Sequence, residues 1–223
     1  MKKSFILISL ATAIVTNTNA QSTGDTQEMK DPKAKAILDK LSEQNKNYNT
    51  ISANFDYNLK NSGEGIDETQ SGKLITKGNK YKLEIAGQQI ISDGTTAWTF
   101  LKDDCEVQIQ EAEGDDEEGI FDPVSIFTIY ENGFKYKFDS DNGTTQIINL
   151  YPEDANEKSY HTIKLLVDKA KTQITSIVIK AKDGNTYTYN LKSFDTNKNF
   201  SDDFFKFKVE NSGCDEVEEI DLR

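Results

Sequence analysis

Polar and apolar residues alternate along most of the chain, as they do in strands that bury one face. The clearest run spans residues 51–60, where Ile, Ala, Phe, Tyr and Leu alternate with polar side chains. Similar runs return at short intervals, with the turn pairs Asp93-Gly94, Asn142-Gly143 and Asp183-Gly184 between them. The pattern predicts a single domain of about ten or eleven antiparallel strands, the last near residues 205–209, that forms a barrel or a curved sheet.

Two segments with helical periodicity interrupt the strands. Asp31-Pro32 supplies an N-cap and a proline at the first helical position, and an apolar stripe at three- and four-residue spacing includes Leu38 and Leu41. Asp122-Pro123 repeats this start signal, and Gly133 suits the position after a helix end. We therefore expect two or three short helices against the sheet, the second with an apolar face made by Val124, Phe127, Ile129 and Tyr130.

The ends of the chain predict how it is processed. A basic start, an apolar run over residues 5–15 and small residues before Ala20 are typical of a secretory signal peptide over residues 1–20. We expect cleavage after Ala20 and export as a soluble protein. Residues 21–30 are then a flexible segment, residues 31–209 one domain, and residues 210–223 an acidic tail.

Composition favours binding over catalysis. The chain has 26 Lys and Arg against 38 Asp and Glu, a net charge of -12, which argues against nucleic acid or an anionic membrane surface as a partner. It has one His, His161, in a strand pattern without a neighbouring nucleophile motif. The acidic run of residues 111–122 lacks the ligand spacing of a calcium loop. We expect no enzyme activity, no cofactor and no metal.

The cysteines and the apolar face each leave two alternatives open. Cys105 and Cys214 could form one disulfide in an oxidising compartment, or they could remain two free thiols. The apolar face of the sheet could be a filled core, or it could line an incompletely filled barrel that receives an apolar ligand. A filled core would suit a structural or adhesive secreted protein.

Several segments, in the same order along the chain, match one known family. They are a first strand at residues 51–55, a hairpin at 72–74 and 79–85, an Asp-Gly…Trp hairpin at 91–100, and a closing strand at 204–207. Together with the opening helix they resemble the periplasmic outer-membrane lipoprotein carrier proteins, the LolA-like family, from Asp31 through Val209.

The resemblance implies an unclosed antiparallel half-barrel with a helical lid, whose apolar interior shelters the acyl chains of lipoproteins. It also implies an inner-membrane ABC transporter that supplies cargo, an outer-membrane acceptor, and only transient contact with membranes. A monomer is the default for such a shuttle. A lipid-binding or lipoprotein-sensing module with the same fold is the alternative function.

The predicted cavity divides into a sheet side and a lid. The sheet side consists of aromatic and aliphatic residues from alternating strands: Phe55, Tyr57, Tyr81, Leu83, Ile85, Trp98 and Phe100. The lid consists of Leu38, Leu41, Phe127, Ile129 and Tyr130.

Overall fold

The structure is a computed structural model that describes residues 30–112, 127–128, 130–131 and 133–223. The predicted signal peptide, Ile129 and the predicted start of the second helix at Asp122-Pro123 lie outside these residues. No helix in the described part of the chain is long and apolar enough to cross a membrane.

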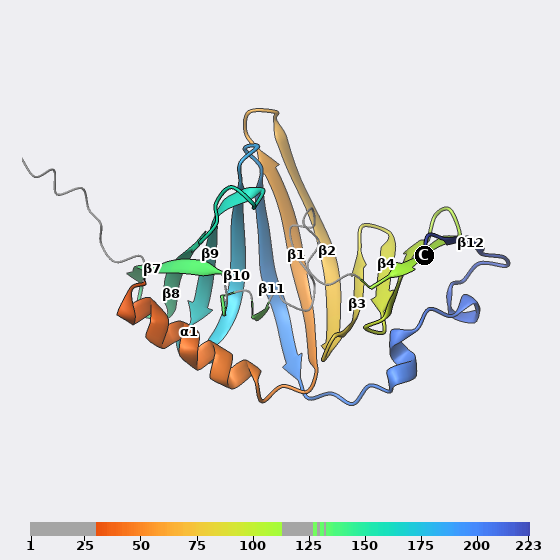
Figure 1. The fold of residues 1–223 in the computed structure, drawn as a ribbon, viewed down its shortest axis with the longest axis horizontal. Coiled ribbons are helices and arrows are strands. Elements are labelled where there is room, and N and C mark those ends of the chain that lie inside the picture. Colours follow the sequence, from red (N-terminus) through yellow and green to blue (C-terminus); the bar gives the residue numbers. More distant parts are fainter. Residues whose placement is uncertain (1–29, 113–126, 129, 132) are drawn as a thin grey trace, which may run out of the picture.

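In the described part of the chain, twelve strands form one sheet that does not close on itself (Figure 1). The order across the sheet is β12-β6-β5-β4-β3-β2-β1-β11-β10-β9-β8-β7. All neighbours are antiparallel except β12 and β6, which are parallel. The predicted half-barrel is therefore confirmed. The strands are β1 (Ile51–Asn61), β2 (Ile66–Lys77), β3 (Lys80–Ile85), β4 (Gln88–Ser92), β5 (Thr96–Leu101), β6 (Glu106–Glu111), β7 (Phe134–Asp141), β8 (Thr145–Pro152), β9 (Tyr160–Asp168), β10 (Gln173–Ala181), β11 (Thr186–Thr196) and β12 (Glu218–Asp221).

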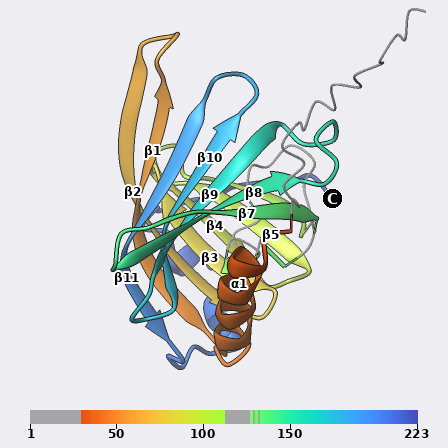
Figure 2. The ribbon, with the colours of Figure 1, turned by 90° about the vertical axis from the view of Figure 1, so that its left-hand side faces the viewer.

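One α-helix, α1 (Pro32–Asn45), lies across one face of this sheet (Figure 2). The predicted cap is present: Asp31 Oδ1 accepts hydrogen bonds from the backbone N–H of Lys33 at 2.8 Å and of Ala34 at 3.4 Å. The other carboxylate oxygen of Asp31 accepts from the N–H of Phe138 at 3.1 Å. This second bond ties the start of α1 to β7.

The strand register divides the side chains between two faces. Directly opposed residues of neighbouring antiparallel strands point to the same side of the sheet. We call the side covered by α1 the inner face and the opposite side the outer face. The main hydrophobic core lies on the inner face, between α1 and strands β7–β11 and β1–β3.

The C-terminal segment differs from the prediction. The expected strand at residues 205–209 is replaced by two 3-10 helices, η2 (Asp202–Phe205) and η3 (Val209–Asn211). Lys206 and Lys208 between them do have extended backbone angles, so the alternation in the sequence is real. This stretch nevertheless lies on the outer face, where Phe205 becomes fully buried and Phe207 packs on Phe100 with ring centroids 5.1 Å apart.

The predicted acidic tail is part of the fold. Residues 218–221 form β12, which pairs with β6 from Glu106 to Ile109. Cys214 is bonded to Cys105, and their Cα atoms lie 6.0 Å apart. The structure therefore selects the disulfide over two free thiols, and the bridge holds the C-terminal segment against the outer face.

Candidate functional site

The inner face is completely buried on one half of the sheet. The side chains that β8, β9 and β10 direct toward α1 are inaccessible to solvent: Ile148, Leu150, Ile163, Leu165, Ile177 and Ile179. From α1, Leu38 and Leu41 belong to the same cluster, and Leu41 is only 1% exposed. This half is a filled core.

The other half of the inner face is apolar but only half-buried. Side chains from β1, β3 and β11 pack against the core and remain partly accessible. They are Tyr57, Tyr81, Leu83, Ile85, Tyr187, Tyr189, Leu191 and Phe194, which we call the half-buried wall. A protein that needs only a core would not normally leave so many contiguous apolar side chains partly accessible.

Aromatic rings organise the centre of this wall. The ring centroids of Tyr57 and Tyr189 are 5.1 Å apart, and those of Phe55 and Tyr189 are 5.9 Å apart. Phe55 is directly opposite Gly72 on β2, and a Cβ atom at Gly72 would lie 2.5 Å from Phe55 Cζ. The glycine therefore allows the Phe55 ring to lie flat over the neighbouring strand.

The tyrosines keep the wall electrically neutral. Burial raises the pKa of Tyr57, with a smaller contribution from the neighbouring Tyr187. Burial also raises the pKa of Tyr189 strongly. The hydroxyls of Tyr57 and Tyr189 are thus protonated at any physiological pH. At these two positions the wall presents aromatic rings and neutral hydroxyls to a ligand.

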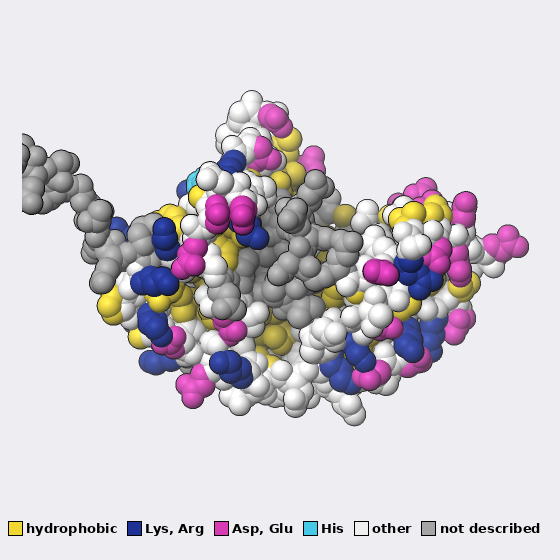
Figure 3. All heavy atoms as spheres, in the orientation of Figure 1, with side chains coloured by type: hydrophobic (Ala, Val, Ile, Leu, Met, Phe, Trp, Pro, Cys, Tyr) yellow, Lys and Arg dark blue, Asp and Glu magenta, His cyan; other side chains and the backbone are white. Residues whose placement is uncertain are grey.

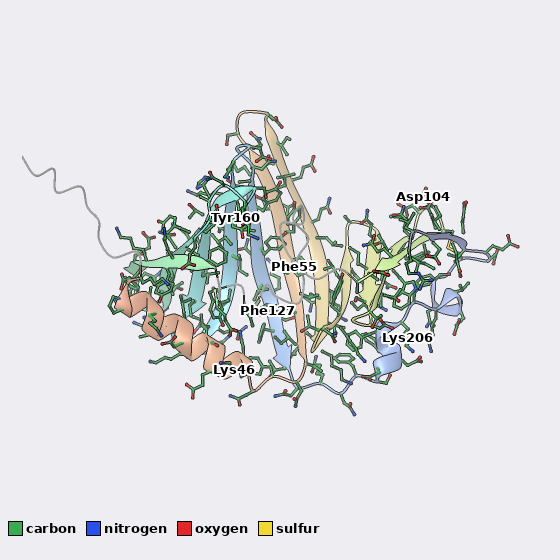
Figure 4. All side chains as sticks on the ribbon, in the orientation of Figure 1. Lys46, Phe55, Asp104, Phe127, Tyr160 and Lys206 are labelled. Carbon is green, nitrogen blue, oxygen red and sulfur yellow. A yellow bond between two sulfur atoms is a disulfide. The ribbon has the colours of Figure 1, made fainter. Side chains whose placement is uncertain are left out.

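Phe127 and Tyr130, which we call the lid segment, are hydrogen-bonded to the C-terminal end of α1. Asn45 Nδ2 donates hydrogen bonds to the carbonyl of Phe127 at 2.7 Å and to the hydroxyl of Tyr130 at 3.1 Å. Phe127 is 3% exposed, and its ring meets that of Phe194 edge-on with centroids 5.4 Å apart. Figure 4 shows Phe127 near the sheet, above the end of α1 that carries Lys46. These contacts join α1, Phe127, Tyr130 and β11 into one unit.

Most of the predicted cavity residues share the inner face. On the sheet side they are Phe55, Tyr57, Tyr81, Leu83 and Ile85, and on the lid side Leu38, Leu41, Phe127 and Tyr130. Their predicted role as ligand contacts stays a prediction. Ile129, the remaining lid residue, lies outside the described residues.

Trp98 and Phe100 were predicted wrongly, because both lie on the outer face. Trp98 is directly opposite Ile91, which is opposite Lys82, whereas Leu83 aligns with Ile90. In β5 both sets of alternating positions carry apolar residues, so the two larger side chains did not identify the inner set. Phe100 instead belongs to a second small core with Ile75, Ile91, Val107 and Phe205, whereas Trp98 is only partly buried on the same face.

The contribution of β11 to the half-buried wall was not predicted from the sequence. Tyr187, Tyr189 and Leu191 are paired with Leu59, Tyr57 and Phe55 on β1, on the inner face. Their period of two was visible in the sequence, but nothing local indicated that β11 is the neighbour of β1. Gly72 was also missed as the residue that accommodates Phe55.

The described residues contain no group of three or more His, Cys, Asp or Glu side chains that could hold a metal ion. The site is therefore characterised by its apolar wall and its attached lid.

A comparison with known proteins identifies the family of this chain. Residues 46–208 match the sequence model of the family described as outer membrane lipoprotein carrier protein LolA. The chain belongs to the LolA family. No curated protein matches it at a significant level.

Solved structures are similar to this chain at low sequence identity. An uncharacterized conserved protein from Thermus thermophilus aligns with a TM-score of 0.52 and 10% identity, over 85% of this chain and 99% of that one. A LolA superfamily protein from Nitrosomonas europaea aligns with a TM-score of 0.43 and 13% identity, over 78% and 97% of the two chains. MucB in the MucA/MucB complex of Pseudomonas aeruginosa aligns with a TM-score of 0.46 and 12% identity, over 80% of this chain and 62% of that one.

Proposed function

We propose that this LolA-family protein is a periplasmic carrier that binds the acyl chains of lipoproteins on the half-buried wall and moves them from the inner to the outer membrane. The observation that supports the proposal most is the wall itself. It is a neutral apolar surface, continuous with the core, that the described part of the chain covers only partly.

The energy of acyl burial is sufficient for such a task. Each methylene removed from water contributes about 0.8 kcal/mol, so a chain of about 14 methylenes gains roughly 11 kcal/mol when fully enclosed. Loss of translational freedom and ordering of side chains remove several kcal/mol of this gain. Partial enclosure on the wall reduces the affinity further, which suits a carrier that has to release its cargo.

The two halves of the inner face have different roles in this proposal. The filled half under α1 gives rigidity, because its side chains are fully buried and α1 is tied to β7 through Asp31. The half-buried wall receives the acyl chains. The contact of Asn45 with Phe127 and Tyr130 holds the lid segment at the boundary between the halves.

The family assignment supports a proposal for the partners. We propose that an inner-membrane ABC transporter supplies the cargo, that an outer-membrane acceptor receives it, and that the carrier is a monomer that contacts membranes transiently. The apolar wall would be occupied during transit and empty after delivery.

A release assay tests the proposal. Vesicles that contain a diacylated lipoprotein are incubated with the protein, and the soluble complex is separated by size. We expect the acylated lipoprotein to appear in the complex and its non-acylated form, made by replacing the acceptor cysteine, to remain uncomplexed. Equal recovery of both forms would show that the protein does not recognise acyl chains.

A further inference from the structure

The outer face carries a basic hollow where the C-terminal segment crosses the sheet. The hollow has a volume of about 290 Å³ and lies between β3, β4 and residues 201–211. Ile91 and Phe204 contribute apolar surface. Lys82, Lys206 and Lys208 contribute positive charge, and Asp203 contributes one carboxylate. At the right of Figure 3, lysine side chains gather over this part of the molecule.

The lysines around the C-terminal segment fall into two groups. Lys77 and Lys80 both bind Asp202, at 2.8 and 2.9 Å, and Lys208 binds Asp203. These pairs hold η2 against the sheet and neutralise one another in part. The positive charges of these three lysines are therefore already paired with carboxylates of the C-terminal segment.

Lys82 and Lys206 are different. Neither forms an ion pair with a carboxylate of the described residues. Lys82 is half-buried, with its ammonium group 5.0 Å from the centroid of the Phe204 ring. Burial lowers the pKa of Lys82. The negative charge of Glu84 opposes this shift, and the positive charges of Lys102 and Lys73 add to it.

Polar groups accompany these two lysines. Ser201, Asn211 and Gln89 also line the hollow and can donate hydrogen bonds. A second hollow of about 140 Å³ shares Lys82 and Phe204 and adds Lys73 and Glu84. The carboxylate of Asp203 lines the first hollow too, but it is paired with Lys208, so the lysines leave an excess of positive charge there in a chain whose net charge is -12.

We infer that this hollow binds a phosphate group, with Lys82 and Lys206 as its cationic ligands and Ser201 and Asn211 as neutral donors. A phosphate presents three acceptor oxygens and close to two negative charges, which match two unpaired lysines better than a carboxylate does. The hollow has space for roughly ten water molecules at liquid density, which is enough for a phosphate with a small organic substituent. The site lies on the opposite side of the sheet from the half-buried wall and is independent of the acyl-carrier function.

The probe for the test is glycerol 3-phosphate, followed by NMR shifts of the Ser201 and Asn211 amides. Lys206→Gln is the main variant, because Lys206 is exposed, lines the hollow and forms no ion pair among the described residues. Lys46→Gln is the matched control, because Lys46 is also exposed and lies at the other side of the molecule (Figure 4). Lys82→Gln is a second variant, compared only after its thermal unfolding has been checked.

We expect saturable shifts in the wild type, a dissociation constant raised roughly three- to tenfold by Lys206→Gln, and no change with Lys46→Gln. Acetate at the same ionic strength should not produce the shifts. Absence of saturable shifts, or equal binding by wild type and Lys206→Gln, would overturn the inference.

A second arm identifies the source of the phosphate. Co-sedimentation with vesicles that contain phosphatidic acid, but not with phosphatidylcholine vesicles, would assign the site to the phosphomonoester headgroup of a lipid if Lys206→Gln weakens it. Binding of glycerol 3-phosphate without such sedimentation would assign it to a soluble phosphate. The Leu83→Asp variant, altered on the inner face, should retain either behaviour, which separates this site from the acyl-binding wall.

Discussion

Leu83 offers the sharpest perturbation of the proposed acyl site. It lies on the inner face of β3, directly opposite Leu74 on β2 and Ile90 on β4. Full burial of a leucine is worth about 1.5–3 kcal/mol, so an acyl chain that covers this half-buried side chain gains about 1 kcal/mol from it. Leu83→Asp removes that gain and places a carboxylate beneath the acyl chain, which costs several kcal/mol more.

The two losses together predict a dissociation constant at least about 100-fold higher, since about 2.7 kcal/mol corresponds to that factor. The unliganded variant should still fold, because water can solvate a carboxylate at a half-buried position, and we expect a stability loss of about 1–2 kcal/mol. Titration with a fluorescent fatty acid measures the affinity, and urea unfolding measures the stability.

Ile109→Asp is the matched control for Leu83→Asp. Ile109 is also a half-buried aliphatic residue in a strand, but it is opposite Trp98 and therefore lies on the outer face. This variant should bind the fatty acid as the wild type does. The reasoning is refuted if folded Leu83→Asp protein binds with wild-type affinity, or if Ile109→Asp weakens binding equally.

Three further predictions concern the fold. Gly72→Ala would push a methyl group into the Phe55 ring, where a Cβ would lie 2.5 Å from Cζ, and should destabilise the protein by about 1–3 kcal/mol in urea unfolding. Adding Phe55→Leu should recover part of this loss, whereas simply additive losses would contradict the contact. Replacing Cys105 and Cys214 by serine should lower stability by up to about 4–5 kcal/mol in urea unfolding, because the bridge joins residues 109 apart in the chain, and unchanged stability would count against this role. Hydrogen bonds from Lys77 and Lys80 lower the pKa of Asp202 to about 2 from its ordinary 3.8, so its stabilising contacts should persist above 3.8 and be lost as the pH falls through 2. Asp202→Asn should abolish this part of the acid dependence of η2 hydrogen exchange, and an identical pH profile in the variant would argue against it.

Local signals in the sequence were sufficient to predict α1 and β1. The Asp31-Pro32 start predicted α1, and the alternation from Ile51 predicted β1 with its correct inner face. Both patterns work because each depends on one segment that buries one side. The open half-barrel fold and the LolA-like family are likewise confirmed.

Long-range placement was harder to predict. In β5 each face carries one buried residue, Ala97 toward the interior and Phe100 beneath the C-terminal segment, so alternation could not tell the inner face from the outer face at Trp98. Residues 205–209 alternate as a strand would, yet they cover a sheet face instead of extending its edge. Their position depends on apolar residues of β2–β6 that are distant in the sequence.

The pairing of β11 with β1 had the same difficulty. It joins residues more than a hundred positions apart and brings Tyr187 and Tyr189 into the half-buried wall. Only the three-dimensional order of the strands shows that these tyrosines belong to the candidate site. The disulfide was left open for a related reason, since two cysteines in a sequence do not reveal whether their Cα atoms come within bonding range.

The location of a bound acyl chain tests the central claim most directly. Trp98 is the single tryptophan of the chain and lies on the outer face, whereas Trp98→Phe combined with Tyr81→Trp places the single tryptophan on the half-buried wall. A fatty acid brominated along its chain quenches tryptophan fluorescence on contact. The account predicts strong, saturable quenching of the tryptophan at position 81 and little quenching of Trp98. Stronger quenching of Trp98, or no saturable quenching at either position, would contradict the claim that acyl chains bind on the inner face.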